Sequence, residues 1–316
     1  MFVLYSFFGV AFHQSHEEKS FIGWMRDSNI LFTGEDYHSR FGIWITNQRI
    51  VREHNMANVG FSLGMNHLSH LTPSEYKAML GFKASIKNRL AKRSDTISIE
   101  EIDWRQKGIV NRVKDQTSEC GSCWAFSAVQ AQESQWAKTH GTLYKLSESN
   151  LVDCVTTCGG CDGGLMDASY DYIIQYQDGL FMNDEDYQYV PHKSSCRFNK
   201  IKGVTKLTGY INVVEGSEDD LASKISIFGV AAIGIDASHW SFHLYSSGIY
   251  DEKSCSPVEI NHAVGCVGYG SENGKNFWII RNSWSEGWGE NGYIRMVKDK
   301  GNQCGESTYA IIPINA

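Results

Sequence analysis

The chain has 316 residues, of which 42% are hydrophobic and 12% aromatic, so it can bury one large core or two ordinary ones. Its formal net charge of -7 argues against nucleic acid as the main partner, because a phosphate-binding surface needs an excess of basic residues. Nine cysteines indicate an oxidising compartment.

The N-terminal stretch from Phe2 to Phe12 is apolar, too short to span a bilayer and of the length of a signal-peptide core. It lacks a basic region before this core. We expect residues 1–15 to be a signal peptide that directs the chain into the secretory pathway. No later segment is apolar enough to cross a membrane.

A long helix is predicted next. Six residues recur at steps of four and three, which places them along one helix face: Asp36, Arg40, Trp44, Asn47, Val51 and Asn55. The motif Gly64-x-Asn66-x-Leu68-x-His70 follows. The segment from Lys83 to Thr96 is polar and basic, which suits a linker that is removed by proteolysis.

A second helix is predicted from Ser122 to His140, with Ser122 as the N-cap and Gly141 as the stop. Cys123 is then its first residue, at the positive end of the helix dipole. A thiol attacks a carbonyl carbon as the thiolate, which a helix N-terminus or a neighbouring imidazolium stabilises. Cys123 is therefore a candidate nucleophile.

Further along, the chain alternates apolar segments with turns such as Ser271-Glu-Asn-Gly274, which predicts β-structure. His262 opens one of these apolar segments and Asn282 closes another. The chain thus contains a histidine and an amide that can accompany the thiol of Cys123.

Seven motifs occur in the order typical of one family. They are Cys120-Gly-Ser-Cys-Trp124 with the preceding Val113-Lys-Asp-Gln116, Leu146-Ser-Glu148, Asp153-Cys154, Cys161-Asp-Gly-Gly-Leu-Met166, Asn261-His-Ala-Val264, Val267-Gly-Tyr-Gly270, and Arg281-Asn-Ser-Trp284 with Gly287-Trp-Gly-Glu-Asn-Gly-Tyr293. The chain resembles the papain family of cysteine proteases, and its cathepsin L-like members most.

The resemblance implies an α+β, papain-like two-domain fold preceded by a helical propeptide. Residues 16–97 would form an inhibitory propeptide and residues 98–316 the mature peptidase, which starts near Ser98. A helical domain at about 110–210 and an antiparallel, β-barrel-like domain at about 211–310 would enclose the site in the cleft between them.

By resemblance, Cys123 is the nucleophile, His262 takes its proton, and Asn282 orients the imidazole. The side chain of Gln116 and the backbone N–H of Cys123 would bind the oxyanion. Gln116, however, lies seven residues before Cys123, where the family has six. Either the loop bulges outward and Gln116 keeps its place, or the oxyanion hole is weakened. We favour the bulge, because surface loops absorb an insertion at low cost.

Substrate binding is also implied by resemblance. The main chain at Gly163 and Gly164 would pair an extended substrate, and Trp284 would lie beside the catalytic pair. The second subsite would be apolar and would favour Leu, Val or Phe at P2. Its expected lining is Leu165, Met166, Gly234, Ile260 and Tyr309. No insertion that could occlude the cleft separates Cys161 from Cys196, so we expect an endopeptidase.

The family's disulfide pairing would join Cys120 to Cys161, Cys154 to Cys196, and Cys255 to Cys304. Cys266 is then a buried packing residue, whereas Cys158 is either a free thiol or an alternative disulfide partner. At His70 the family has an aspartate that contributes to acid-triggered release of the propeptide. His70 can keep such a trigger by charging near pH 6.5.

Two alternatives come from other classes. Cys120-x-x-Cys123 and Cys158-x-x-Cys161 could bind structural zinc. A catalytically inactive, peptide-binding relative would fit the loop insertion and Ser285, where the family has glycine. The retained Cys123, His262 and Asn282 favour a monomeric, secreted or lysosomal protease. Its expected partners are peptide and protein substrates, its own propeptide and cystatin-like inhibitors, with no cofactor and no metal.

Overall fold

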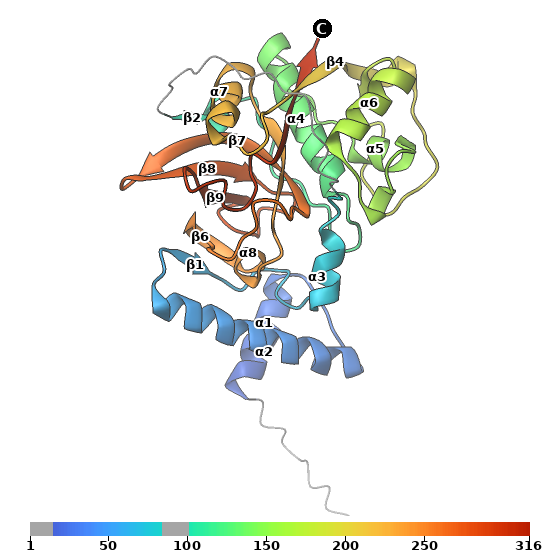
Figure 1. Ribbon diagram of the computed structural model, residues 1–316. Helices are drawn as coiled ribbons and strands as arrows, with labels where there is room; N and C mark the ends of the chain where they lie inside the picture. Colours follow the sequence, from blue (N-terminus) through green and yellow to red (C-terminus); the bar gives the residue numbers. More distant parts are fainter. Residues whose placement is uncertain (1–14, 84–100) are drawn as a thin grey trace, which may run out of the picture.

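The computed structural model describes residues 15–83 and 101–316. The predicted signal-peptide core, the basic linker and the expected start near Ser98 lie outside these residues. Figure 1 shows the N-terminal helices beneath a body in which a large sheet stands beside three helices, labelled α4, α5 and α6. In the described part of the chain, no helix combines the length and apolar character needed to cross a membrane.

The N-terminal part forms its own small core of aromatic side chains. Phe21 and Trp24 of the first helix pack against Trp44 of the second, with ring centroids 5.5 and 6.3 Å apart respectively. This part contains α1 (His16–Asp27), α2 (Gly34–Ala57), β1 (Phe61–Leu63) and α3 (Pro73–Met79). The predicted long helix is confirmed as α2.

The predicted face of α2 binds the segment that follows it. Asn47 Nδ2 donates to Ser69 O over 2.9 Å, and Asn55 exchanges two hydrogen bonds with the backbone of Leu63. Arg40 forms a bidentate pair with Glu75 of α3. The residues spaced along α2 therefore fix the course of residues 61–75 toward the rest of the molecule.

The second predicted helix is also confirmed, as α4 (Cys123–His140) with Gly141 as its C-cap at φ 75°. Ser122 is the N-cap residue, but its hydroxyl pairs with Tyr189 Oη instead of capping the helix. The other helices are α5 (Glu148–Cys154), α6 (Met166–Tyr176), α7 (Glu218–Phe228), α8 (Trp240–His243) and the 3-10 turns η1 (Trp104–Lys107), η2 (Gly160–Asp162) and η3 (Lys200–Lys202).

The sheet has the strand order β1-β6-β9-β8-β7-β5-β10-β4-β3, with β2 paired to β7. Its pairs are antiparallel except for the parallel pair of β6 and β9. The strands are β2 (Ile102–Asp103), β3 (Leu180–Met182), β4 (Gly203–Asn212), β5 (Ala231–Ile235), β6 (Tyr245–Tyr250), β7 (His262–Glu272), β8 (Lys275–Arg281), β9 (Tyr293–Val297) and β10 (Tyr309–Asn315). The N-terminal part thus extends the sheet through β1, which pairs with β6.

The two halves meet where α4 lies against β7. Ser127 Oγ donates to Val264 O over 2.7 Å, and Gln130 lies so close to Gly265 that a Cβ there would be 2.5 Å from its amide. Arg281 at the end of β8 donates to Gln130 Oε1. These contacts fix the second turn of α4 against the start of β7.

The structure contains the three disulfides that the resemblance implies, Cys120–Cys161, Cys154–Cys196 and Cys255–Cys304. Cys158 is a buried free thiol, and its Sγ lies 3.5 Å from the backbone nitrogen of Leu165. Since Cys120 and Cys161 bond to each other, the four-cysteine zinc site is wrong.

Two adjacent loops contain residues in the left-handed region. Thr117 has φ 63° and Ser285 has φ 58°, and Ser285 N donates to Lys114 O over 3.1 Å. A β-branched residue is rarely found in this region, because its Cβ meets the backbone. The insertion before Cys120 and the serine in place of glycine are therefore both accommodated with backbone strain.

Replacing Thr117 by glycine should relieve this strain. We expect Thr117→Gly to raise the free energy of unfolding by about 1 kcal/mol, measured by denaturant unfolding of the full chain. Ser118→Gly is the matched control, since Ser118 lies in the same loop but not in the left-handed region. Equal effects of the two substitutions would mean that Thr117 carries no strain.

Candidate active site

Cys123 lies at the N-terminus of α4 and is fully buried. Burial raises the pKa of its thiol to about 11, although backbone groups of Ala263, Gly81 and its own helix turn act in the opposite direction. Gly81 belongs to the segment after α3. The thiol is therefore covered by the N-terminal part of the same chain.

His262, the first residue of β7, faces Asn282, which directly follows β8. Its Nε2 lies 2.8 Å from Asn282 Oδ1, and the ring of Trp284 packs 4.8 Å away. Burial lowers the pKa of His262 to about 4. In this state the imidazole is neutral, as is the thiol of Cys123.

Gln116 is fully buried despite the additional residue in its loop. Its Nε2 donates to Cys120 O and to Met79 O, each over 3.0 Å, and its Oε1 accepts from Ser283 Oγ over 2.7 Å. The additional residue is taken up between Gln116 and Cys120, where Glu119 is exposed. The geometry thus corresponds to the outward bulge. The amide of Gln116 is directed at Met79 O, at the start of the segment from Met79 to Lys83 that covers the site, which we call the covering segment.

That covering segment also pairs with the glycines of the helical half. Gly164 N donates to Gly81 O over 2.9 Å, and Phe82 N donates to Asn261 O over 3.1 Å. Phe82 and Gly164 form a parallel β-bridge. A Cβ on Gly163 would lie 2.5 Å from Gly81 O, so this close approach requires glycine. Gly163 and Gly164, which we expect to pair with substrate, thus contact the backbone of the covering segment at Gly81.

Phe82 inserts into the predicted second subsite. Its ring lies 4.8 Å from that of Tyr309, edge to face, and a Cβ on Gly234 would be 2.6 Å from it. Ile260 lines the same wall. Phe82 is 3% exposed, so the pocket encloses a complete aromatic ring. Of the remaining predicted lining residues, Met166 is fully buried and Leu165 is partly buried.

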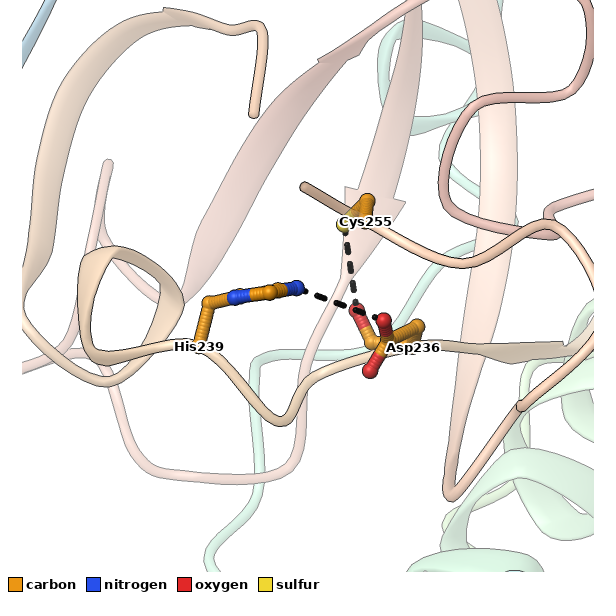
Figure 2. Close-up of side chains that lie close together, drawn as sticks. All are labelled: Asp236, His239 and Cys255. Atoms are coloured by element: carbon orange, nitrogen blue, oxygen red, sulfur yellow. Dashed lines mark hydrogen bonds and ion pairs between the residues drawn. The ribbon is translucent and has the colours of Figure 1, made fainter. Parts of the chain in front are cut away.

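One group of potential metal ligands occurs among the described residues, formed by Asp236, His239 and Cys255 (Figure 2). The sulfur of Cys255 is bonded to Cys304 and is not a free thiolate. Asp236 accepts hydrogen bonds from Ser256 N and from Asn261 Nδ2, over 2.8 and 3.1 Å. The carboxylate therefore orders the loop that leads into His262.

Several residues of the site were missed by sequence analysis. Gly81 and Phe82 follow the C-cap of α3, Leu80, and an adjacent glycine and aromatic residue at this place are the signal that could have identified them. Two other residues hold Gln116 in place. Ser283 Oγ donates to its side-chain oxygen, and the hydroxyl of Tyr189 donates to its backbone oxygen over 2.9 Å. No sequence pattern indicates Tyr189, because it is distant in the chain from Gln116.

Two family models match the chain. Residues 99–314 match the family model described as Papain family cysteine protease, and residues 21–76 match the Cathepsin propeptide inhibitor domain. A Cathepsin L-like proteinase of Fasciola hepatica is 39% identical over 311 residues, covering 93% of this chain and 92% of the relative.

Solved structures of precursors are similar over nearly the whole chain. Digestive procathepsin L 3 of the Tenebrio molitor larval midgut has a TM-score of 0.87 at 35% identity, covering 95% of this chain and 99% of that one. A recombinant stem bromelain precursor has a TM-score of 0.87 at 30% identity, with the same coverage.

Proposed function

Since the chain belongs to the papain family of cysteine proteases and contains a cathepsin propeptide inhibitor domain at residues 21–76, we propose that Cys123, His262 and Asn282 are its catalytic residues. The hydrogen bond of His262 Nε2 to Asn282 Oδ1 carries the proposal, because it leaves the other ring nitrogen, Nδ1, without a partner and available to a thiol proton.

Catalysis begins when His262 takes the proton of Cys123, giving a thiolate and an imidazolium. The sulfur attacks the peptide carbonyl, and the oxyanion receives hydrogen bonds from Gln116 Nε2 and the backbone N–H of Cys123. His262 returns the proton to the leaving amine as the C–N bond breaks, which leaves a thioester. Water, deprotonated by His262, then hydrolyses the thioester and restores the thiol.

The propeptide suppresses this chemistry in two ways. Gly81 lies against the thiol, and burial favours the neutral form of both Cys123 and His262. Release of the segment admits water, which lowers the cost of separating charge. Gln116 then exchanges Met79 O for the substrate oxyanion.

The specificity that we propose follows from Phe82. Its buried ring shows the size and apolar character of the pocket beside Gly234 and Tyr309. A substrate with Phe, Leu or Val at P2 supplies an equivalent side chain. The enzyme is an endopeptidase that acts as a monomer, in a lysosome-like compartment or outside the cell. Its precursor is cleaved near Ser98, and cystatin-like proteins inhibit the mature form.

Release of the propeptide is coupled to pH through three histidines, of which His243 is buried and His67 and His70 are half-buried. Burial and the positive charge of Arg40 lower the pKa of His70 to about 4, while Glu75 acts in the opposite direction. Burial also lowers the pKa of His243 to about 4. It lowers the pKa of His67 as well, and there the carboxylate of Asp115 acts in the opposite direction. The inhibited state therefore binds fewer protons than the open state, whose histidines titrate near 6.5. Acidification from about 6.5 toward 4 favours release.

Removing the nucleophile tests the assignment. Cys123→Ala should abolish peptide hydrolysis and leave an unprocessed precursor, and His262→Ala should be nearly as damaging because the two residues act as a unit. Both are measured with a peptide amide that has Leu at P2. Cys266→Ala, which removes another buried free thiol, should keep activity. Hydrolysis by Cys123→Ala at the wild-type rate would end the assignment.

The role of Gln116 is tested separately. Gln116→Ala should lower kcat by about 10²-fold, as loss of one oxyanion donor does in other proteases. Deleting Glu119 should change kcat little, since the bulge already directs Gln116 into the site. A silent Gln116→Ala together with a gain on deletion of Glu119 would show that the insertion has displaced the amide.

The pH coupling predicts the behaviour of the full-length proenzyme. His70→Gln removes one titrating group from the propeptide, where its ring packs on Trp24 and Phe32, so activity should appear only at a lower pH than in the wild type. The onset is measured as hydrolysis after incubation across a series of acidic buffers. His38→Gln, an exposed histidine of the same propeptide, is the control. An unshifted onset in His70→Gln would assign the trigger to other groups.

A further inference from the structure

A hollow of about 470 Å³ lies in the helical half, beside the loop that carries Gln116. The first turns of α4 and α5 border it. Its described lining residues all lie between residues 111 and 189, so they belong to the peptidase and remain when the propeptide leaves. Neither Cys123 nor His262 is among them. The lining residues that determine its chemistry are Lys114, Asp115, Phe126, Glu148 and Tyr189.

One carboxylate oxygen of Glu148 lacks a hydrogen-bond donor. Glu148 is 1% exposed, and its Oε1 accepts from Lys114 Nζ over 2.7 Å, whereas its Oε2 is buried without a partner in the described part of the chain. Lys114 cannot supply the missing bond, because its three protons already go to Glu148 Oε1, Glu133 Oε1 and Leu146 O. A buried acceptor without a donor costs free energy. The hollow therefore favours a ligand that donates a hydrogen bond to Glu148.

The charges around the hollow favour a cation. Its three cationic side chains are already paired, Arg112 with Glu286, Lys145 with Asp184, and Lys114 with Glu133 and Glu148. The carboxylate of Asp115 accepts from Thr117 N over 2.9 Å but has no ion pair among the described residues. Asp115 is exposed. A positively charged ligand would thus meet an unpaired carboxylate at the surface and the buried carboxylate of Glu148 further in.

Two aromatic rings complete the lining. Phe126 and Tyr189 meet edge to face, with ring centroids 4.8 Å apart, and Phe126 is 4% exposed. Such rings attract a further ring and a delocalised cation. An aromatic amidinium offers a planar ring together with paired N–H donors that match a carboxylate. We propose that this hollow binds a small aromatic cation of this kind, with its charge between Glu148 and Asp115 and its ring beside Phe126 and Tyr189.

Occupation of the hollow affects Gln116. Tyr189 Oη donates to Gln116 O over 2.9 Å, and Asp115 holds the next residue through Thr117 N. A cation at Asp115 competes for the carboxylate that Thr117 N binds, in a loop whose backbone is already strained at Thr117. The amide of Gln116 is then held less firmly, so the ligand lowers kcat without raising KM. This second step rests on the proposed function, because it needs Gln116 as an oxyanion donor, whereas binding in the hollow does not.

Benzamidine is the probe, and its neutral analogue benzamide is the matched control. Both are titrated calorimetrically into the full-length precursor at about pH 7.5, because burial raises the pKa of Glu148 to about 7 and the carboxylate must be ionised. In the precursor the covering segment fills the cleft, so the cleft is closed to the probe. Benzamidine should bind at least about tenfold more tightly than benzamide. Equal affinities, or no binding of benzamidine, would overturn the proposal.

Substitutions locate the site. Asp115→Asn removes the exposed charge but keeps an oxygen for Thr117 N, and it should weaken benzamidine binding by about fivefold. Glu148→Gln should weaken it by about tenfold, with the thermal unfolding of this buried variant compared with that of the wild type. Glu119→Gln is the matched control, since it removes an exposed carboxylate of the same loop that does not line the hollow. Unchanged affinity in Asp115→Asn would overturn the assignment to this hollow.

The effect on catalysis is measured with the acid-activated enzyme and a peptidyl coumarylamide that has Leu at P2, as initial rates at the pH of the titration. Saturating benzamidine should lower kcat by about threefold or more and leave KM unchanged. A rise in KM at constant kcat would show binding in the cleft and contradict the link to Gln116.

The two measurements separate the proposal from the proposed function. If the activated enzyme does not hydrolyse the coumarylamide, the proposed function fails, and the titration of the precursor still decides whether the hollow binds the cation. If the enzyme hydrolyses it and benzamidine binds without changing kcat, only the link from the hollow to Gln116 fails.

Discussion

The close approach of two backbones, at Gly81 and Gly121, is the constraint on which the inhibited state depends. A Cβ on Gly81 would lie 1.7 Å from Gly121 O, and a Cβ on Gly121 would lie 2.7 Å from Ala78 O. Only glycine at both positions lets the propeptide lie directly on the thiol. Every other inhibitory contact, from the ring of Phe82 in its pocket to the carbonyl on Gln116, follows from this placement.

The propeptide is held in this position from a distance. The polar face of α2 fixes residues 61–75 through Asn47, Asn55 and Arg40. Asn66 then donates to His243 O, and β1 extends the sheet of the peptidase. A long helix that does not touch the cleft therefore determines where Gly81 lies. Three histidines lie along this path, His243 buried and His67 and His70 half-buried, and they are the basis of the pH coupling that we propose.

The sequence could predict those parts of the site that local patterns encode. The helix that presents Cys123 was predicted from its N-cap and its terminal glycine, and the long propeptide helix from its spacing. The position of Gln116 could not be decided from the sequence, because it depends on whether Thr117 tolerates a left-handed backbone. The seat of Tyr76 of α3 was also missed, because its hydroxyl donates to Ala237 O, a carbonyl 161 residues away that only the fold brings close.

The most direct measurement is the rate at which iodoacetamide alkylates Cys123, followed by mass spectrometry across a range of pH in the proenzyme and in the acid-activated enzyme. If the propeptide both covers the thiol and keeps it neutral, the proenzyme should remain unmodified at every pH that leaves it intact. The activated enzyme should react rapidly well below the ordinary pKa of a thiol, about 8.5. Equal rates in the two forms would contradict the propeptide's control of the nucleophile.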